Sequence, residues 1–352
     1  GWIADKWNYR SPMLLGALLN AVGCFLIATG IHELFYFSLF MIACGYGIFT
    51  PSILSILGFT YRNHPHLRES GFSIYYASIN VGVFLALASL GTIAKLYSWR
   101  LAFSVAGIVQ LIGLIPLVMY LILHKDSHTV FEAEQKKEKA KQNAFSQKEK
   151  DRLWVIGVFC LISILFWIAY NQAFSSIEIF IHSFMNKVVH GYNIPEGVFL
   201  STESFFLIVL APILSVLYAY LQKRKKDPAP PVKTCLSLFF MALSFAMMVI
   251  ASLSIPSGAQ SASVPYGYLI IAFFLMAVGE MLLAPIGLSM ITNLAPRRLT
   301  AFLVGLWYVC VGLAFFIGGM LASFMSALPS LSAFFSIFTL MMLIPGVVLV
   351  FW

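Results

Sequence analysis

Three acidic residues lie within long apolar stretches of this 352-residue chain: Glu178, Glu203 and Glu280. Glu280 is near the middle of residues 268–294, a stretch that is almost wholly apolar and long enough to cross a bilayer as a helix. An acid at that depth costs about 3 kcal/mol on insertion scales unless a partner, water or a proton accompanies it. No Lys or Arg lies at comparable depth in the sequence, so the three acids cannot all stay ionised in a low dielectric. We therefore expect proton carriers or cation-binding groups of a transport pathway. The alternative is an acid that only ties two helices together.

Other polar residues at membrane depth are weaker signals. Asn80 has small neighbours, and such residues suit close helix packing as well as ligand binding. Asn171 and Glu178 are seven residues apart, so we predict that they share one helix face. His182, four residues beyond Glu178, is predicted to pair with it, in a gate at the outer end or in a purely structural role.

The composition indicates a membrane protein. The chain is 60% hydrophobic and 10% charged, which no soluble domain of this length resembles. Its net charge of +8 comes from short loops between apolar runs, so anionic lipid, and not nucleic acid, is the expected charged partner. The five cysteines show no CxxC spacing, and no HExxH or GxSxG motif occurs. We therefore expect no enzyme activity, metal or cofactor.

Ten apolar stretches have the length of complete spans: 11–30, 35–59, 71–94, 101–123, 153–185, 197–221, 234–254, 268–294, 301–325 and 332–352. Basic residues favour the cytoplasmic side, and only Lys95, Arg100 and Lys187 would lie outside if residues 1–10 are cytoplasmic. Residues 124–152 are strongly charged and predict a cytoplasmic linker. The linker divides an incomplete N-terminal transmembrane half, 1–123, from a six-helix C-terminal half, 153–352.

Four motifs resemble those of the proton-dependent oligopeptide transporter family within the major facilitator superfamily. GFSIYYASINVGVFLA resembles the fifth-helix signature FxxFYxxINxG, and VGEMLLAPIGLSMITNLAP resembles the tenth-helix stretch SxGExxxSPxGLSxxTKLAP. FWIAYNQAFSS resembles the seventh helix, and GWIADKW resembles the end of the second helix with its basic turn. The resemblance implies an all-α major facilitator fold of two pseudo-symmetric six-helix halves, with the first two helices missing from this sequence.

The resemblance also implies residue roles. Asn80 matches the asparagine that binds the peptide backbone, and Glu280 matches the acid that pairs with the substrate's amino terminus. Trp307 matches a tryptophan that lines the pocket, although alone it would be an ordinary core residue. Tyr76 falls on the signature tyrosine, and we assign it to the substrate site with Asn171.

Three departures from the family pattern concern coupling. Thr50 replaces the fourth-helix lysine that is linked to the peptide carboxylate. Asn171 stands where the seventh helix keeps an acid, and Glu203 stands where the eighth helix keeps an asparagine. An acid and an asparagine have thus exchanged places, so Glu203 is expected to carry the proton, together with Glu280.

The sequence therefore predicts a monomeric, multi-pass proton symporter of a bacterial inner membrane, which imports di- and tripeptides or related amine-bearing solutes by alternating access. Prolines within three spans, Pro51, Pro212 and Pro285, are expected to break the helices and permit rocking. One alternative is a major facilitator transporter of amino acids or other cationic solutes, which the loss of the lysine at position 50 favours. Another is a transceptor or a remnant that does not transport.

Overall fold

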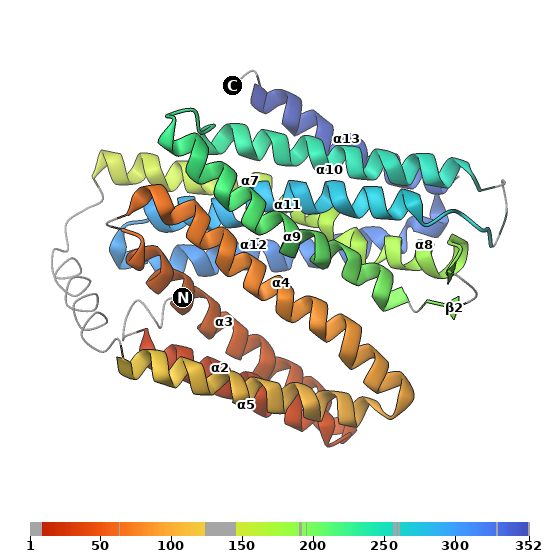
Figure 1. Ribbon diagram of the computed structural model, residues 1–352, viewed down its shortest axis with the longest axis horizontal. Helices are drawn as coiled ribbons and strands as arrows, with labels where there is room; N and C mark the ends of the chain where they lie inside the picture. Colours follow the sequence, from red (N-terminus) through yellow and green to blue (C-terminus); the bar gives the residue numbers. More distant parts are fainter. Residues whose placement is uncertain are drawn as a thin grey trace. The chain divides into compact units, whose positions relative to one another are not determined.

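The computed structural model describes residues 9–62, 64–123, 146–189, 192–194, 196–255, 259, 261–328 and 330–350. Figure 1 shows that most of the described chain forms long helices. In chain order the elements are α2 (Arg10–Ala28), η1 (His32–Leu34), α3 (Phe35–Thr60), α4 (Pro65–Leu96), α5 (Trp99–Leu123), α7 (Gln147–Asn171), η2 (Gln172–Phe174), α8 (Ser176–Phe184), β1 (Val188–Val189), β2 (Tyr192–Asn193), α9 (Glu196–Lys223), α10 (Pro230–Leu253), α11 (Gly267–Leu294), η3 (Arg297–Leu299), α12 (Thr300–Ser323), η4 (Met325–Ala327) and α13 (Leu331–Val350).

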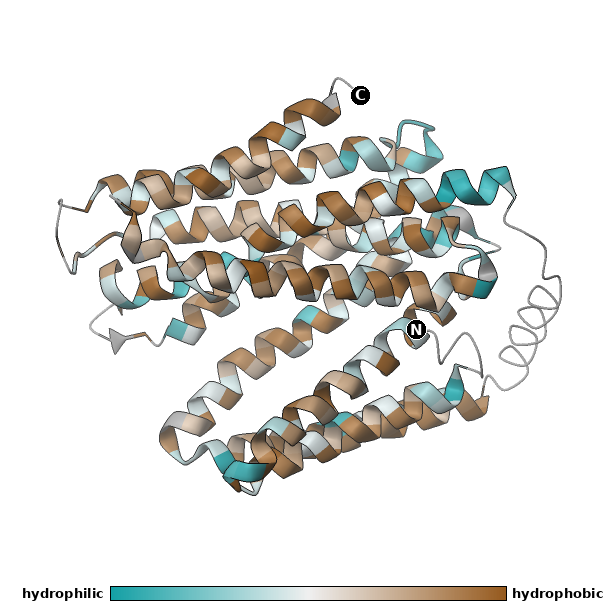
Figure 2. Ribbon diagram, turned by 180° about the vertical axis from the view of Figure 1, so that it is seen from behind, coloured by the Kyte–Doolittle hydropathy of each residue, from teal (hydrophilic) through white to brown (hydrophobic). Residues whose placement is uncertain are grey.

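Ten helical segments of the described chain are long and apolar enough to cross a membrane, as the sequence predicts. Figure 2 shows hydrophobic colour along most of each helix, while hydrophilic colour gathers near helix ends and in connections. The span boundaries differ from the predicted ones by a few residues. The largest differences are at α4, which begins at Pro65 and not at residue 71, and at α7, which begins at Gln147 and not at residue 153. The chain is therefore a multi-pass, all-α membrane protein.

The described residues fall into two compact units. Unit 1 consists of Gly1–Pro65, Ser89–Gly157 and Leu288–Tyr308, and unit 2 consists of His66–Ala88, Val158–Gly287 and Val309–Trp352. The predicted division into halves at 1–123 and 153–352 stays a prediction. The basic turn of residues 1–8 and positions 124–145 of the predicted linker lie outside the described residues.

In unit 1, α2 packs beside both α3 and α5 (Figure 1). The backbones of α2 and α3 approach closely, because a Cβ on Gly16 would lie 2.6 Å from the carbonyl oxygen of Gly45. Small residues allow such contacts between membrane helices. After α2 the chain turns at Gly30, whose φ of 71° favours glycine. Arg100 donates from Nε to the carbonyl oxygen of Ala28 over 3.1 Å, which satisfies the end of α2.

In unit 2, α10 packs along α13, and the backbones of α10 and α11 also approach closely. The hydroxyl of Ser244 donates to the carbonyl oxygen of Ala272 over 2.7 Å. A Cβ on Gly279 would lie 2.9 Å from the carbonyl oxygen of Ser237. Because Gly279 immediately precedes Glu280, this contact fixes the part of α11 that presents the acid.

A short antiparallel pairing of β1 and β2 follows α8, with Val188 opposite Asn193. The end of α8 is also tied to a distant segment, because the backbone of Val264 bonds to both Phe184 and Asn186 over 2.9 Å. The sequence predicts only loops here, since two-residue strands are too short to give a period-2 pattern.

The prolines do not end the helices. Pro51, Pro212 and Pro285 lie inside α3, α9 and α11, each of which continues past its proline. A proline removes one backbone hydrogen bond, and membrane helices tolerate that loss when neighbouring groups satisfy the freed carbonyl. The expectation of helix breaks at these positions is therefore wrong for the described backbone.

The fifth predicted span is interrupted where the sequence predicts a continuous helix. It forms α7, then the 3₁₀ turn η2, then α8, with Ser175 out of helical geometry at φ −136° and ψ −91°. The buried side chain of Gln172 bonds to the carbonyl oxygen of Gly318 over 3.0 Å, and it accepts from the Ser176 hydroxyl over 2.7 Å. Side-chain bonds to nearby polar groups compete with the helix ladder. Asn171 and Glu178 therefore lie on different helices, which corrects the predicted shared face.

The start of α7 includes part of the predicted linker. Ser146 and Glu149 form a capping box, in which the backbone nitrogen of Ser146 donates to Glu149 over 2.9 Å and the backbone nitrogen of Glu149 donates to the Ser146 hydroxyl over 3.3 Å. Residues 147–152 are therefore helical.

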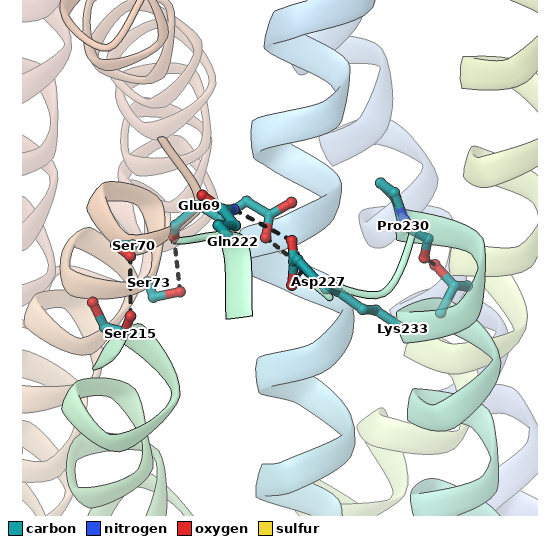
Figure 3. A network of polar contacts seen from close by, with 9 residues as sticks. Glu69, Ser70, Ser73, Ser215, Gln222, Asp227, Pro230 and Lys233 are labelled. Carbon is teal, nitrogen blue, oxygen red and sulfur yellow. Dashed lines mark hydrogen bonds and ion pairs between the residues drawn. The ribbon is translucent and has the colours of Figure 1, made fainter. Parts of the chain in front are cut away.

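A buried ion cluster ties α4 to the connection between α9 and α10 (Figure 3). Lys233, with a side chain 2% exposed, contacts Glu69 at 2.6 Å and Asp227 at 2.9 Å. Its ammonium group also lies 4.3 Å from the ring centre of Tyr218. At the next residue of α4, the Ser70 hydroxyl donates to the carbonyl oxygen of Ser215 over 3.2 Å. The cluster therefore fixes the beginning of α4 against α9 and α10.

We predict that Lys233→Met lowers the free energy of unfolding by about 3 kcal/mol, because two carboxylates whose side chains are only 15% and 17% exposed lose their cation. Lys187→Met is the matched control. Lys187 pairs with Glu196 at 2.6 Å, but the two side chains are 20% and 33% exposed, so its loss should cost no more than about 1 kcal/mol. Thermal unfolding of the full-length protein in detergent measures both variants, and equal shifts would contradict the assignment of the cluster as an anchor.

Candidate functional site

The candidate site forms around Glu280 in unit 2. Glu280 lies on α11 between Ala277 and Met281, which pack with Leu207 and Ala211 of α9 in one buried apolar cluster. Glu203 is on the same stretch of α9, one helical turn before Leu207. Both acids are 2% exposed, so each is buried within the protein, and their depth in the membrane stays a prediction.

Each acid accepts a hydrogen bond from a tyrosine of another helix. The hydroxyl of Tyr76, on α4, donates to Oε1 of Glu280. The hydroxyl of Tyr170, on α7, donates to Oε2 of Glu203 over 3.3 Å. Tyr170 also interacts with Glu280 and Tyr76, so one small region contains side chains from four helices. Two phenols thus replace part of the water that a carboxyl group loses on burial.

The two acids also face each other. Their carboxyl groups are within hydrogen-bonding reach, although neither carboxylate can donate without a proton. Oε1 of Glu203 and Oε2 of Glu280 are buried and have no donor among the described residues. Within the described chain, the polar side chains that contact the two acids are Tyr76, Tyr170 and the acids themselves. A pair of this kind can hold a proton, bind a cation or do both.

The predicted asparagines occupy different surroundings. Asn80 lies one turn beyond Tyr76 on α4, and its amide donates to the carbonyl oxygen of Tyr76 over 3.0 Å. Asn171 packs against α12, because a Cβ on Gly318 would lie 2.9 Å from its Cβ. The buried Oδ1 of Asn171 has no partner among the described residues. Among those residues it is Tyr170, and not Asn171, that α7 presents to Glu203.

Two other predicted positions belong to unit 1. Trp307 is 1% exposed, and its ring lies edge-on to that of Tyr308 at 4.9 Å. Thr50 is buried within α3. Both residues belong to unit 1, whereas Glu203 and Glu280 belong to unit 2. The predicted role of Trp307 at the substrate therefore stays a prediction.

The predicted pair of Glu178 and His182 is wrong. His182 Nδ1 lies 3.2 Å from Oε1 of Glu196, at the start of α9. Lys187 contacts the same carboxylate oxygen and also donates to the carbonyl oxygen of His182. The strands between α8 and α9 reverse the chain and bring Glu196 back to His182. Residue spacing within one helix cannot predict such a contact. Glu178 is exposed.

Within the described residues, no three His, Cys, Asp or Glu side chains group as metal ligands. Sequence reasoning did, however, miss two residues of the site region, Tyr170 and Gln172. Tyr170 lies among the aromatic side chains of α7, and only its proximity to Glu203 distinguishes it. Gln172 is fully buried and bonds to α12, and its place in FWIAYNQAFSS is the one sequence signal that could have found it.

Comparisons with known proteins identify the family and the fold. The family model for the Major Facilitator Superfamily matches residues 1–259. Dipeptide and tripeptide permease B of Photorhabdus asymbiotica is 26% identical over 94% of this chain and 76% of its own length.

Solved structures also share the fold. A peptide transporter POT in complex with sulfate has a TM-score of 0.76 and 24% identity, covering 99% of this chain and 81% of that one. A POT family transporter in complex with 5-aminolevulinic acid has a TM-score of 0.75 and 20% identity, with coverage of 99% and 82%. The predicted fold is therefore confirmed.

We predict that Gly318→Ala disturbs the contact between α7 and α12. The new Cβ would lie 2.9 Å from Asn171 Cβ and 3.0 Å from the carbonyl oxygen of Ile168, neither of which can yield without moving α7. Overpacking of this kind destabilises by about 1–3 kcal/mol. Gly319→Ala is the control, since its Cβ would meet nothing within 4 Å. Thermal unfolding of the two variants checks the prediction, which is wrong if they unfold alike.

Proposed function

Because the chain belongs to the major facilitator superfamily, we propose that it is a proton-coupled symporter that imports di- and tripeptides or related small amine-bearing solutes by alternating access. Its similarity to a dipeptide and tripeptide permease supports the choice of substrate. The inner membrane of a bacterium is the proposed location, and the proposed working form is a monomer.

The observation that carries the proposal is the buried pair of Glu203 and Glu280, which has no Lys, Arg or His among its partners in the described chain. Uncompensated acids inside a membrane protein are expensive and mark ion or substrate pathways. A protonated amine and a proton are the two positively charged species that peptide uptake supplies. The pair can therefore bind both.

We assign the amine to Glu280 and the coupling proton to Glu203, with Glu280 contributing to coupling. Tyr76 positions the carboxyl group of Glu280. Asn80 and Asn171 provide amide groups for the substrate backbone, and Oδ1 of Asn171 has no described partner that would have to be displaced. Trp307 is proposed as an apolar wall. Glu178 and His182 stay candidates for an outer gate, now with Glu196 as the partner of His182.

A second candidate function is the import of amines other than peptides. Thr50 favours it, because a peptide carboxylate would find no lysine at this position. The POT family transporter solved with 5-aminolevulinic acid, an amine that is not a peptide, has the same fold. Competition of dipeptides and simple amines for uptake by the full-length protein distinguishes the two candidates.

We predict that Glu280→Gln raises the KM for substrates with a free amine at least tenfold, because a charged hydrogen bond is worth about 1.5–3 kcal/mol. Substrates with an acetylated amine should lose much less, since they offer no ammonium group. Uptake by the full-length protein in proteoliposomes measures both. An equal loss for both kinds of substrate would assign Glu280 to packing.

For Glu203→Gln we predict loss of uphill uptake driven by a pH gradient, because a carboxamide cannot carry the proton. Counterflow exchange should persist, since it needs no net proton movement. Adding Asn171→Glu to Glu203→Asn should not restore uphill uptake fully, because Asn171 lies against Gly318 and away from the described contacts of Glu203. A Glu203→Gln protein that still concentrates substrate would overturn the assignment.

A further inference from the structure

We propose that Glu203 and Glu280 share one proton between Oε1 of Glu203 and Oε2 of Glu280, and that the pair keeps this proton while a substrate ammonium group binds. The second statement rests on the proposed function, and the first does not. The pair consists of residues from α9 and α11, and it exists in this chain because an acid stands at position 203.

Hydrogen-bond accounting supports the shared proton. The other oxygen of each acid already accepts from a tyrosine, Tyr76 for Glu280 and Tyr170 for Glu203. The two remaining oxygens are buried and have no donor in the described chain. Buried acceptors almost always have a donor, and two carboxyl groups within bonding reach supply one only if a proton lies between them.

The surroundings also disfavour two ionised acids. The side chains facing the pair are Tyr76 from α4 and Tyr170 from α7, and Leu207, Ala277 and Met281 line the adjoining apolar cluster. Two like charges in contact within a low dielectric repel strongly, so paired carboxyl groups keep a proton that a single group would release.

The shared proton has a consequence for the substrate. A pair with one proton bears a single negative charge, which one ammonium group neutralises. The loaded site is then uncharged, and closing apolar helices around it buries no net charge. Proton and amine therefore occupy the pair together and do not compete for one position.

Tyr76 and Tyr170 are positioning residues in this arrangement. Each hydroxyl donates to one oxygen of one acid and leaves the other oxygen of that carboxyl group without a donor in the described chain. Removing either hydroxyl should change the hydrogen bonding of the same protonated carboxyl pair, although the two tyrosines belong to different helices.

Infrared difference spectroscopy of the full-length protein in lipid tests the proposal, at the pH at which uptake is measured. The substrate-free protein should show one protonated carboxyl band in this site. Glu203→Gln and Glu280→Gln should each abolish it, whereas Glu33→Gln, at an exposed position in η1, should leave it unchanged. Loss of the band in only one of the two site variants would place the proton on one acid and overturn sharing.

A second pair of variants keeps the test valid if the glutamine variants do not fold. Tyr76→Phe and Tyr170→Phe should both move this band to a higher frequency, because each removes a hydrogen bond from the same pair. Movement in only one variant would contradict the shared proton.

Saturation with a dipeptide tests joint occupancy. The band should persist with the substrate bound, and its disappearance would show that the amine displaces the proton. If the band behaves as expected but no peptide or amine is taken up, the proposed function fails while the shared proton stands. If uptake is coupled as proposed but the band depends on one acid alone, the shared proton fails.

Discussion

A carboxyl group can be buried among apolar helices only if a donor, a cation or a proton accompanies it. This constraint governs two polar regions of unit 2. At one, Lys233 lies between Glu69 and Asp227, and the charges are largely balanced by direct contact. At the other, Glu203 and Glu280 have tyrosine donors and each other, with no basic side chain among their described contacts. The first arrangement suits a fixed anchor, because nothing has to bind or leave. The second has no fixed cation in the described chain, which suits the transport site proposed for it.

The helical spans were predictable because each depends only on the apolar length of one continuous stretch of sequence. A stretch such as 268–294 is apolar over the thickness of a bilayer, and no other regular structure satisfies its backbone there. The depth of Glu280 follows from the same pattern. The role of Glu280 in binding the substrate's amino terminus follows only from its resemblance to a family motif, and not from its position in an apolar helix.

The parts that the sequence did not predict depend on contacts between segments. The interruption after Asn171 requires the backbone of Gly318 as an acceptor for Gln172, and the two positions are 146 residues apart. His182 takes Glu196 as its partner because the intervening strands reverse the chain. Tyr170 is one of 15 tyrosines, and no local pattern separates it from the others. Such contacts depend on how helices pack against one another, and the residue periodicity of a single helix carries no information about that packing.

The ion cluster at Lys233 also bears on how the protein is made. Glu69 and Lys233 are separated by 164 residues, so the ribosome synthesises the rest of α4 and three further spans (α5, α7 with α8, and α9) before the lysine exists. Until then, Glu69 has no cation from α10, and water at the membrane surface is the cheapest place for its charge. The beginning of α4 should therefore stay at the surface during early insertion and settle against α9 and α10 only after α10 has entered the membrane. Assembly of this region is then a late step of biogenesis, in which the order of synthesis, and not helix propensity, sets the pace.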